Sequence, residues 1–208
     1  MNCEFVNVAT ADGLDLQGLV FAPQKANTVA VWIHGLTASF HSNYKRTTTL
    51  AKVFNDAGLA YATFDNRGHD GVTFNKKWDK RKKKGYRPVT IGTVYEVFED
   101  CVLDLDAIVD FLQKRFKNVI LIGHSTGANK VVYYLSRPGK QKKVAGAVLA
   151  GPVSDIPLAK KELKGNYEKA LAHAREMIKS GKKFDLMPLE LSKYLRTAQR
   201  FLSLSNPN

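Results

Sequence analysis

The segment GHSTG at residues 123–127 places Ser125 between two glycines, directly after the apolar run NVILI. The helical pattern ANKVVYYLS follows it at once. A strand, a tight turn and a helix in this order present a serine oxygen on the turn, where it can attack a carbonyl carbon. Gly123 and Gly127 fit such a turn, because neighbouring backbones come too close for side chains. The pattern predicts a nucleophile; the alternative is a turn in which glycine and serine serve conformation alone.

A second segment, WIHGLT, ends another apolar run at residues 28–35. A His-Gly turn at Gly35 can aim the backbone N–H of Leu36 at the pocket, and Thr126 supplies another N–H just after the serine. Two such donors can stabilise the negative charge of a tetrahedral intermediate, and the loss of one typically costs about 10²- to 10³-fold in rate. We therefore predict an oxyanion hole formed by Leu36 and Thr126.

A nucleophilic serine also needs a histidine base and an acid that orients it. His69 in NRGHDG follows the carboxyl end of a predicted strand and is a candidate base. Asp155 in GPVSD follows another strand and is a candidate acid, although an aspartate before IP also fits a helix cap. Of the other histidines, we expect His34 to brace the turn after its strand and His41 to lie at the border of the pocket. We expect the side chain of His124 to point away from the serine and His173 to pack within a helix.

Apolar periodicity predicts the elements that would hold these residues. Residues 3–10 and 14–22 alternate apolar and polar residues around the turn signal ADG and predict an antiparallel hairpin. Continuous apolar runs predict parallel strands buried on both faces, at residues 28–35, 59–68, 118–125 and 144–152. Helical patterns lie between them, at residues 44–57, 97–112 and 130–136. This alternation predicts an α/β domain with its ligand site at the carboxyl ends of the strands.

The pattern changes after Pro152. Residues 158–179 predict one helix that Gly181 ends, and residues 188–202 predict a second helix with Pro188 in its first turn. Each helix has one apolar face, which fits either packing on the sheet or a lid over a pocket. We therefore predict a core at residues 1–155 and a helical cap or lid segment at residues 156–208.

Three motifs follow one another along the chain: HGLTASF, FDNRGHDGV and GHSTGA, each after a predicted strand. Together they resemble the α/β-hydrolase family, specifically its serine esterases, lipases and acyl-peptidase-like members, over roughly residues 1–155. The resemblance implies an α/β-hydrolase-type, mostly parallel sheet with an N-terminal antiparallel hairpin, helices on both faces and a helical cap after the sixth strand. It also implies an acyl-enzyme on Ser125 that water hydrolyses, without a metal or an organic cofactor.

The resemblance implies an acid and a histidine on loops after two further strands beyond the cap. The residues after Ser125 are instead filled by one helix, one strand and the two cap helices. We therefore predict a C-terminally truncated serine hydrolase that acts on a carboxylic ester or a related small acyl substrate. Two alternatives stay open. One is a complete protein that uses His69 or a histidine of a partner chain, and the other is a non-catalytic protein that binds an anionic ligand or nucleic acid through a basic loop.

That basic loop carries much of the net charge of +13. The segment contains a single acid, Asp79. Its cations are Lys76, Lys77, Lys80, Arg81, Lys82, Lys83, Lys84 and Arg87. Runs of like charge usually repel one another and stay in water, so we predict a mobile surface loop at residues 76–87. A patch for phosphate or another anionic ligand is the alternative, and nucleic acid is not the partner that we expect.

Length and composition predict a globular protein, because 208 residues with 44% hydrophobic content can bury a substantial core. The N-terminus lacks a basic start before an apolar stretch, and no later run is apolar enough to span a bilayer, so we expect a cytoplasmic protein. Cys3 and Cys101 are expected to be reduced there. If the last two strands are absent, an apolar edge strand is left uncovered, and we expect self-association.

Overall fold

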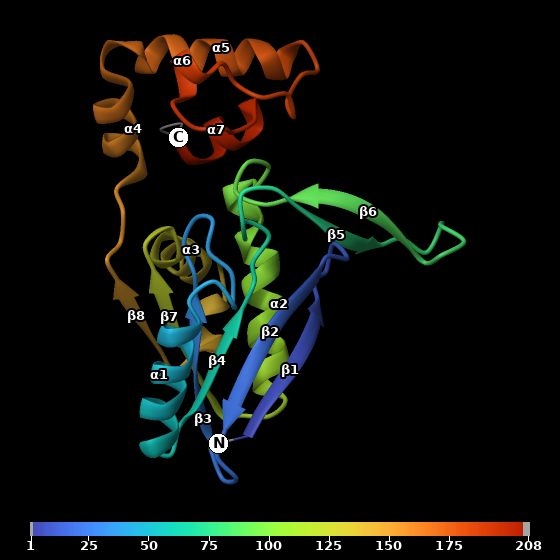
Figure 1. Cartoon of the computed structure of the whole chain (residues 1–208), viewed down its shortest axis with the longest axis vertical. Coiled ribbons are helices and arrows are strands. Elements are labelled where there is room, and N and C mark those ends of the chain that lie inside the picture. The colour runs from blue at the N-terminus through green and yellow to red at the C-terminus, as the bar shows by residue number, and fades with distance from the viewer. Residues whose placement is uncertain (1, 206–208) are drawn as a thin grey trace.

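The computed structural model describes residues 2–205, which form a six-stranded sheet, a separate two-stranded hairpin and a C-terminal group of helices (Figure 1). The main sheet has the order β1-β2-β4-β3-β7-β8. Neighbours pair antiparallel from β1 to β4 and parallel from β4 to β8, which confirms the predicted sheet with its N-terminal hairpin. The strands are β1 (Asn2–Ala9), β2 (Asp15–Ala22), β3 (Thr28–Ile33), β4 (Ala60–Phe64), β7 (Asn118–His124) and β8 (Gly146–Ala150).

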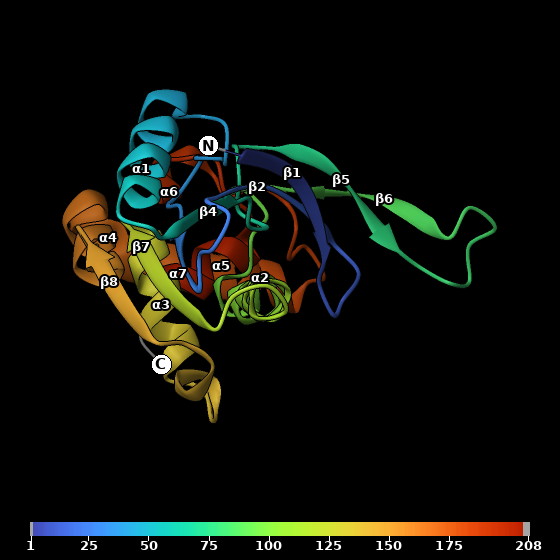
Figure 2. The ribbon, with the colours of Figure 1, turned by 90° about the horizontal axis from the view of Figure 1, so that it is seen from below.

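Helices cover both faces of this sheet, as predicted (Figure 2). On one face, α1 (Tyr44–Asp56) packs through a cluster that includes Ala51 of the helix and Tyr61 of β4. On the other face, α2 (Cys101–Gln113) and α3 (Thr126–Leu135) pack in a larger cluster that includes Leu105, Val131 and Val31 of β3. The sheet is therefore the middle layer of the core. Because helices cover its two faces, a ligand site is expected at the ends of the strands.

The register of the strands brings three carboxyl ends together. Ile33 of β3 pairs with Gly123 of β7, and His124 of β7 pairs with Ala150 of β8. The turn after β3 and the turn after β7 therefore leave the sheet side by side at one edge. This edge is where open α/β sheets place their ligands.

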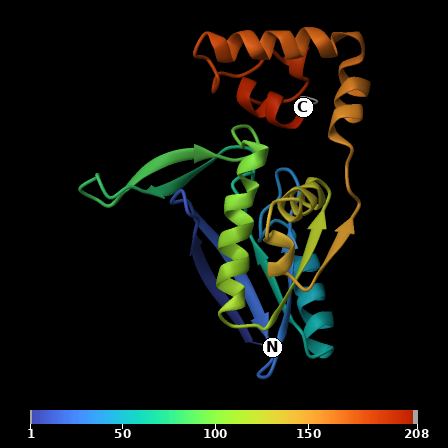
Figure 3. The same cartoon turned by 180° about the vertical axis from the view of Figure 1, so that it is seen from behind.

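The C-terminal helices lie over that edge of the sheet (Figures 1 and 3). Their bounds are α4 (Asp155–Leu163), α5 (Tyr167–Lys179), α6 (Leu189–Ser192) and α7 (Ala198–Ser205). They share a hydrophobic cluster of their own, which includes Leu171, Ala174 and Phe201. Within residues 2–205, no helix has the length and apolar character that crossing a bilayer requires.

Two breaks divide the cap helices that the sequence predicts as continuous. The helix predicted at residues 158–179 breaks at Lys164, whose φ of 50° separates α4 from α5. The helix predicted at residues 188–202 breaks at Lys193, whose φ of 64° ends α6. Both breaks let short apolar faces turn toward one common cluster, which local periodicity does not encode. Gly181, with a φ of 81°, follows the end of α5 as predicted.

Residues 73–91, called the basic arm below, form the strands β5 (Thr73–Trp78) and β6 (Tyr86–Ile91). The prediction of a loop at residues 76–87 is therefore wrong in secondary structure, and the loop is confined to the turn at residues 79–85. Lys76 pairs with Pro88 and Lys77 with Arg87, so cations of this segment lie on regular strands. The basic arm forms its own sheet and projects from the main one in all three views (Figures 1, 2 and 3).

β8 differs from the strand predicted at residues 144–152, which was expected to be buried on both faces. Val148 is 51% exposed and Leu149 is 44% exposed. Within residues 2–205, β8 pairs with β7 alone and so forms an edge of the sheet. An edge position leaves apolar side chains on β8 without a covering layer.

Candidate active site

Ser125 lies between the end of β7 and the start of α3, with φ 55° and ψ −130°. Residues other than glycine rarely adopt this conformation, and it persists only where the surrounding structure holds it. The backbone N–H of Ser125 donates to the carbonyl oxygen of Ala150 at 3.0 Å, and its carbonyl oxygen accepts from the N–H of Ala128 at 2.9 Å. These bonds hold the serine between β8 and α3. The residue is half-buried, which leaves its side chain accessible.

Two glycines beside Ser125 are required by close backbone approach. A Cβ on Gly127 would lie 2.2 Å from the carbonyl oxygen of Ile33, and a Cβ on Gly123 would lie 2.5 Å from the Cα of Ala128. Side chains at these positions would push α3 away from β3 and β7. The glycines therefore hold the start of α3, and with it the serine, against the edge of the sheet.

The turn after β3 packs directly against the serine. A Cβ on Gly35 would lie 3.3 Å from the Oγ of Ser125. Among the described residues, no hydrogen bond uses the backbone N–H of Leu36, which follows this glycine, or that of Thr126 at the start of α3. Free N–H groups on the two turns that flank one serine are the donors that an oxyanion needs. The structure thus brings together six of the predicted residues: Gly35, Leu36, Gly123, Ser125, Thr126 and Gly127.

His34 braces this turn from the buried side. The backbone N–H of Asn66 donates to His34 Nε2 at 3.2 Å, so a neutral ring carries its proton on Nδ1, which donates to the carbonyl oxygen of Gly35 at 2.8 Å. Burial, followed by the charge of Lys130, lowers the pKa of His34 to about 3. Because the ring is neutral and both nitrogens are engaged, His34 has the bracing role that the sequence predicts.

A buried charged network connects this turn with the C-terminal helices. Lys130 of α3 donates to Asn66 Oδ1 at 2.8 Å and pairs with Glu96. Glu96 also pairs with Arg200 of α7 at 3.2 Å. Burial alone would raise the pKa of Glu96, but Lys130 and Arg200 lower it below its ordinary value. Lys130, Glu96 and Arg200 are at most 2% exposed, so each charge depends on the others for compensation.

His69, the candidate base, is oriented by two carboxylates. Its Nδ1 lies 2.9 Å from Asp70 Oδ2 and 3.7 Å from Asp65 Oδ2. Its Nε2 has no hydrogen-bond partner within residues 2–205. In the same part of the chain, no histidine lies within hydrogen-bond distance of Ser125 Oγ. The ring is therefore held as a base would be, without a direct contact to the serine.

Asp155, the candidate acid, is the first residue of α4 and accepts a hydrogen bond of 2.5 Å from Asn129 Nδ2. Burial raises its pKa. No histidine of the described residues contacts its carboxylate, so the structure does not bring the two candidates His69 and Asp155 together. Of the other histidines, His41 contacts Ser39 Oγ at 3.2 Å, and His124 stacks on Trp32 with 5.4 Å between the ring centroids. His173 lies half-buried on α5.

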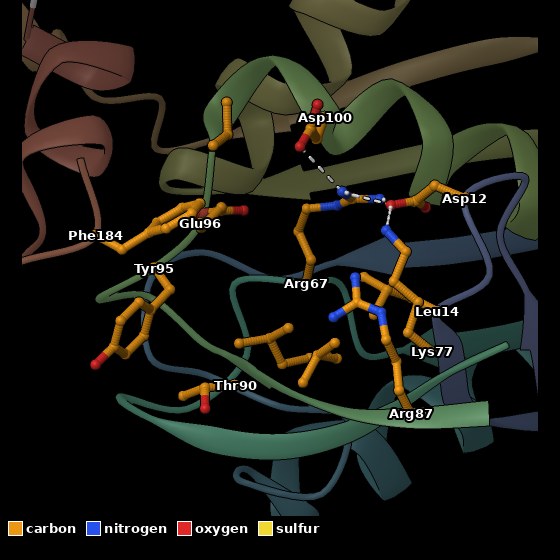
Figure 4. Close-up of a pocket in the computed structure, with 13 residues that line it drawn as sticks. Asp12, Leu14, Arg67, Lys77, Arg87, Thr90, Tyr95, Glu96, Asp100 and Phe184 are labelled. Atoms are coloured by element: carbon orange, nitrogen blue, oxygen red, sulfur yellow. Dashed lines mark hydrogen bonds and ion pairs between the residues drawn. The ribbon is translucent and has the colours of Figure 1, made fainter. Parts of the chain in front are cut away.

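A cavity of about 210 Å³ lies at the base of the basic arm (Figure 4). Arg67 of the NRGHDG motif forms one wall and pairs with Asp12 at 3.2 Å, Asp100 at 3.2 Å and Asp104 at 2.8 Å. Burial alone would lower the pKa of Arg67, but these carboxylates raise it. Phe184 closes the cavity from the side of the cap. The sequence places Arg67 in a motif but does not reveal its acids, which come from distant segments.

The fold defines a class of protein. In structure the chain is similar to a highly thermostable carboxyl esterase from Bacillus coagulans, with a TM-score of 0.63, 17% identity, and coverage of 92% of this chain and 56% of that chain. It is similar to the α/β hydrolase GrgF from Penicillium sp. sh18, with a TM-score of 0.61, 18% identity, and coverage of 91% and 59%. It is also similar to the Pyrococcus furiosus esterase Pf2001, with a TM-score of 0.59, 21% identity, and coverage of 100% and 64%.

These neighbours confirm the predicted α/β-hydrolase fold, and the chain spans between 56% and 64% of their lengths. The chain belongs to the family described as "Protein of unknown function (DUF1749)", whose pattern matches residues 95–208, just over half of the sequence. No curated protein matches it. The matched region includes Ser125, both glycines of its turn and the C-terminal helices.

Proposed function

We propose that this chain carries the nucleophile and the oxyanion hole of a serine hydrolase that acts on a carboxylic ester or a related small acyl substrate. Ser125 Oγ attacks the carbonyl carbon and forms an acyl-enzyme. The backbone N–H groups of Leu36 and Thr126 stabilise the oxyanion, and water then releases the acyl group. No metal or organic cofactor takes part in this chemistry.

The backbone conformation of Ser125 is the observation that carries the proposal. A φ of 55° with a ψ of −130° costs a residue other than glycine about 1–3 kcal/mol. A turn that served conformation alone would be better filled by glycine, which adopts positive φ without strain. The strained turn lies at the carboxyl edge of the sheet and packs against Gly35, the residue before Leu36, which supports Leu36 as an oxyanion donor. The esterases among the structural neighbours support the same class of reaction.

For the base, we propose His69 as the candidate within this chain, oriented by Asp70 and Asp65. Its free Nε2 could take the proton of Ser125 after a movement of the loop at residues 66–71 or through a water. Asp155 is the second candidate acid, and it would act only if a histidine from outside the described residues approached it. The loss of a triad histidine typically removes on the order of 10⁶ in rate, so the base determines whether this chain is active by itself.

We further propose that residues 156–208 act as a cap over a core formed by residues 1–155. The described cap helices share their own hydrophobic cluster and lie over the carboxyl edge of the sheet (Figure 1). The Arg200–Glu96 pair fastens α7 to the core at a buried position. We propose that the cap forms one wall of the substrate site.

A fluorophosphonate probe tests the nucleophile, because it reacts covalently with activated serines. We expect labelling of the wild-type chain and none of Ser125→Ala, which removes the attacking oxygen. Ser154→Ala, at a neighbouring loop after β8, is the matched control and should be labelled like the wild type. Equal labelling of the wild type and Ser125→Ala would contradict the proposal.

The same probe separates the sources of the base. His69→Gln should lower the labelling rate by about 10²- to 10⁴-fold if His69 is the general base, whereas His41→Gln should leave it unchanged. Rapid labelling of His69→Gln would exclude His69 as the general base.

A further inference from the structure

The basic arm takes no part in the candidate active site, yet it concentrates charge at one place on the molecule. Its turn carries the five consecutive cations of residues 80–84, and each of these residues is exposed. The turn lies at the far end of a hairpin that projects from the main sheet in every view (Figures 1, 2 and 3). A flat or extended partner could therefore reach it without touching the core.

Most of this charge has no internal compensation. Asp79 is occupied by Arg81, whose Nε and Nη2 donate to its two carboxylate oxygens at 3.0 and 3.1 Å. No ion pair within residues 2–205 involves the other four cations of the turn, Lys80, Lys82, Lys83 and Lys84. Four uncompensated ammonium groups within five residues repel one another, and an anionic surface would relieve that repulsion.

Aromatic side chains lie beside these lysines. Trp78 and Tyr86 form the last strand pair before the turn, with their ring centroids 6.1 Å apart and their planes at 79°. Trp78 is 52% exposed, and Phe74, four residues earlier on the same face of β5, is 81% exposed. Indole and phenol rings with a polar group at one end are favoured where apolar and aqueous phases meet.

Hydrogen bonds hold the turn in one geometry. The N–H of Trp78 donates to the carbonyl oxygen of Gly13 in the β1–β2 turn at 2.8 Å. Across the arm, the N–H of Asp79 donates to the carbonyl oxygen of Gly85 at 2.9 Å, and the N–H of Gly85 donates to the carbonyl oxygen of Lys82 at 2.8 Å. The lysines and the aromatic rings are therefore presented together, with little loss of backbone freedom on binding.

We propose that the basic arm docks the protein on an anionic lipid surface, with the turn lysines among the headgroups and Trp78 and Phe74 at the interface. A compact group of cations beside exposed apolar rings fits a lipid surface, because the cations can contact anionic headgroups while the rings enter the interface. Single-stranded nucleic acid needs cations along a groove and a row of free ring faces. The arm does not offer such a row, because the Tyr86 face is covered by Lys76 Nζ at 5.1 Å from its centroid.

Vesicle sedimentation tests the proposal with the full chain. We expect binding to phosphatidylcholine vesicles that contain one-third phosphatidylserine, weak binding to pure phosphatidylcholine, and release by high salt. Replacement of Lys80, Lys82, Lys83 and Lys84 by glutamine should lower the partition coefficient by about 1,000-fold. The matched control replaces four exposed cap lysines by glutamine, at Lys161, Lys169, Lys179 and Lys182, and should retain nearly all binding.

Tryptophan fluorescence adds a second readout, because Trp32 is only 7% exposed and Trp78 is 52% exposed. Anionic vesicles should shift the emission to shorter wavelength, and Trp78→Phe should abolish the shift. Absence of wild-type binding, or equal losses in the turn variant and the cap variant, would overturn the proposal. Tighter binding to a single-stranded oligonucleotide, with quenching in place of the shift, would overturn it in favour of nucleic acid.

Discussion

At the scale of residues, the candidate site is organised by close packing and by one neutral histidine. Ser125 is held at positive φ by two backbone hydrogen bonds, and Gly35 allows the neighbouring turn to touch it. His34 secures that turn only while its ring is uncharged, because the N–H of Asn66 occupies Nε2. The geometry around Leu36 should therefore depend on pH.

His34 gives a prediction for stability. Burial lowers its pKa to about 3 in the folded chain, against an ordinary value of 6.5, so the unfolded chain takes up this proton first as the pH falls. The contribution of the neutral His34 ring to the free energy of unfolding is fully present above pH 6.5 and is lost as the pH falls toward 3. The total loss is on the order of 5 kcal/mol. Urea unfolding between pH 7.5 and about 4 measures this slope.

The control is His34→Asn, which should be less stable at neutral pH but should show a flatter slope between pH 6.5 and 4. Burial raises the pKa of Asp65 and of Asp155, which act in the opposite direction near the ordinary range of carboxyl groups, so the difference between the two chains isolates His34. Identical slopes would exclude His34 as the titrating group.

At the scale of elements, a buried ion pair connects α7 to the core, and the local sequence pattern of α7 does not predict it. Arg200 pairs with Glu96 at 3.2 Å, and its Nε donates to the carbonyl oxygen of Thr93 at 3.0 Å. Arg200→Met should lower the free energy of unfolding by about 3 kcal/mol, because it removes one of the two cations that pair with the buried Glu96 carboxylate. Urea unfolding gives the loss in stability.

The same variant should speed amide hydrogen exchange in α7 and in residues 93–97, because the ion pair joins these two segments. Arg137→Met is the control, since this arginine lies at the exposed end of α3 and forms no ion pair in residues 2–205. Unchanged exchange in α7 would show that the hydrophobic cluster of the cap, and not Arg200, holds it in place.

At the scale of the whole molecule, the sheet ends at an apolar edge. β8 pairs only with β7 in the described chain, and Val148 is 51% exposed. Unpaired N–H and C=O groups beside apolar side chains are a template for strand pairing. We predict that this chain self-associates, with a sedimentation coefficient that rises with protein concentration.

Val148→Lys should reduce this association, because a charge on an edge strand opposes pairing with a second copy. Val72→Lys is the matched control, since Val72 is 53% exposed and lies just before the basic arm, away from β8. A wild-type chain that stays monomeric at all concentrations would refute the prediction.

The parts of the fold that the sequence predicts well are those governed by neighbours along the chain. Alternating apolar residues define β1 and β2, continuous apolar runs define β3, β4 and β7, and the glycines around Ser125 mark its turn. The cap helices are predicted less well, because Lys164 and Lys193 break them to reach a shared cluster. The basic arm is mistaken for a loop, since its charge masks a strand pattern that pairing across the hairpin stabilises.

Local patterns along the chain suffice to predict an α/β sheet, the position of Ser125 and the turns that carry Leu36 and Thr126, because apolar periodicity and glycine sterics act over short range. The α/β-hydrolase family is predicted by the resemblance of three motifs. The folded chain alone reveals that Glu96, Lys130 and Arg200 form one buried network, and that His69 contacts Asp70 while Asp155 binds Asn129. The reason is physical. A charge buried at 2% exposure is tolerated only beside its partners, and those partners come from segments that local patterns do not relate.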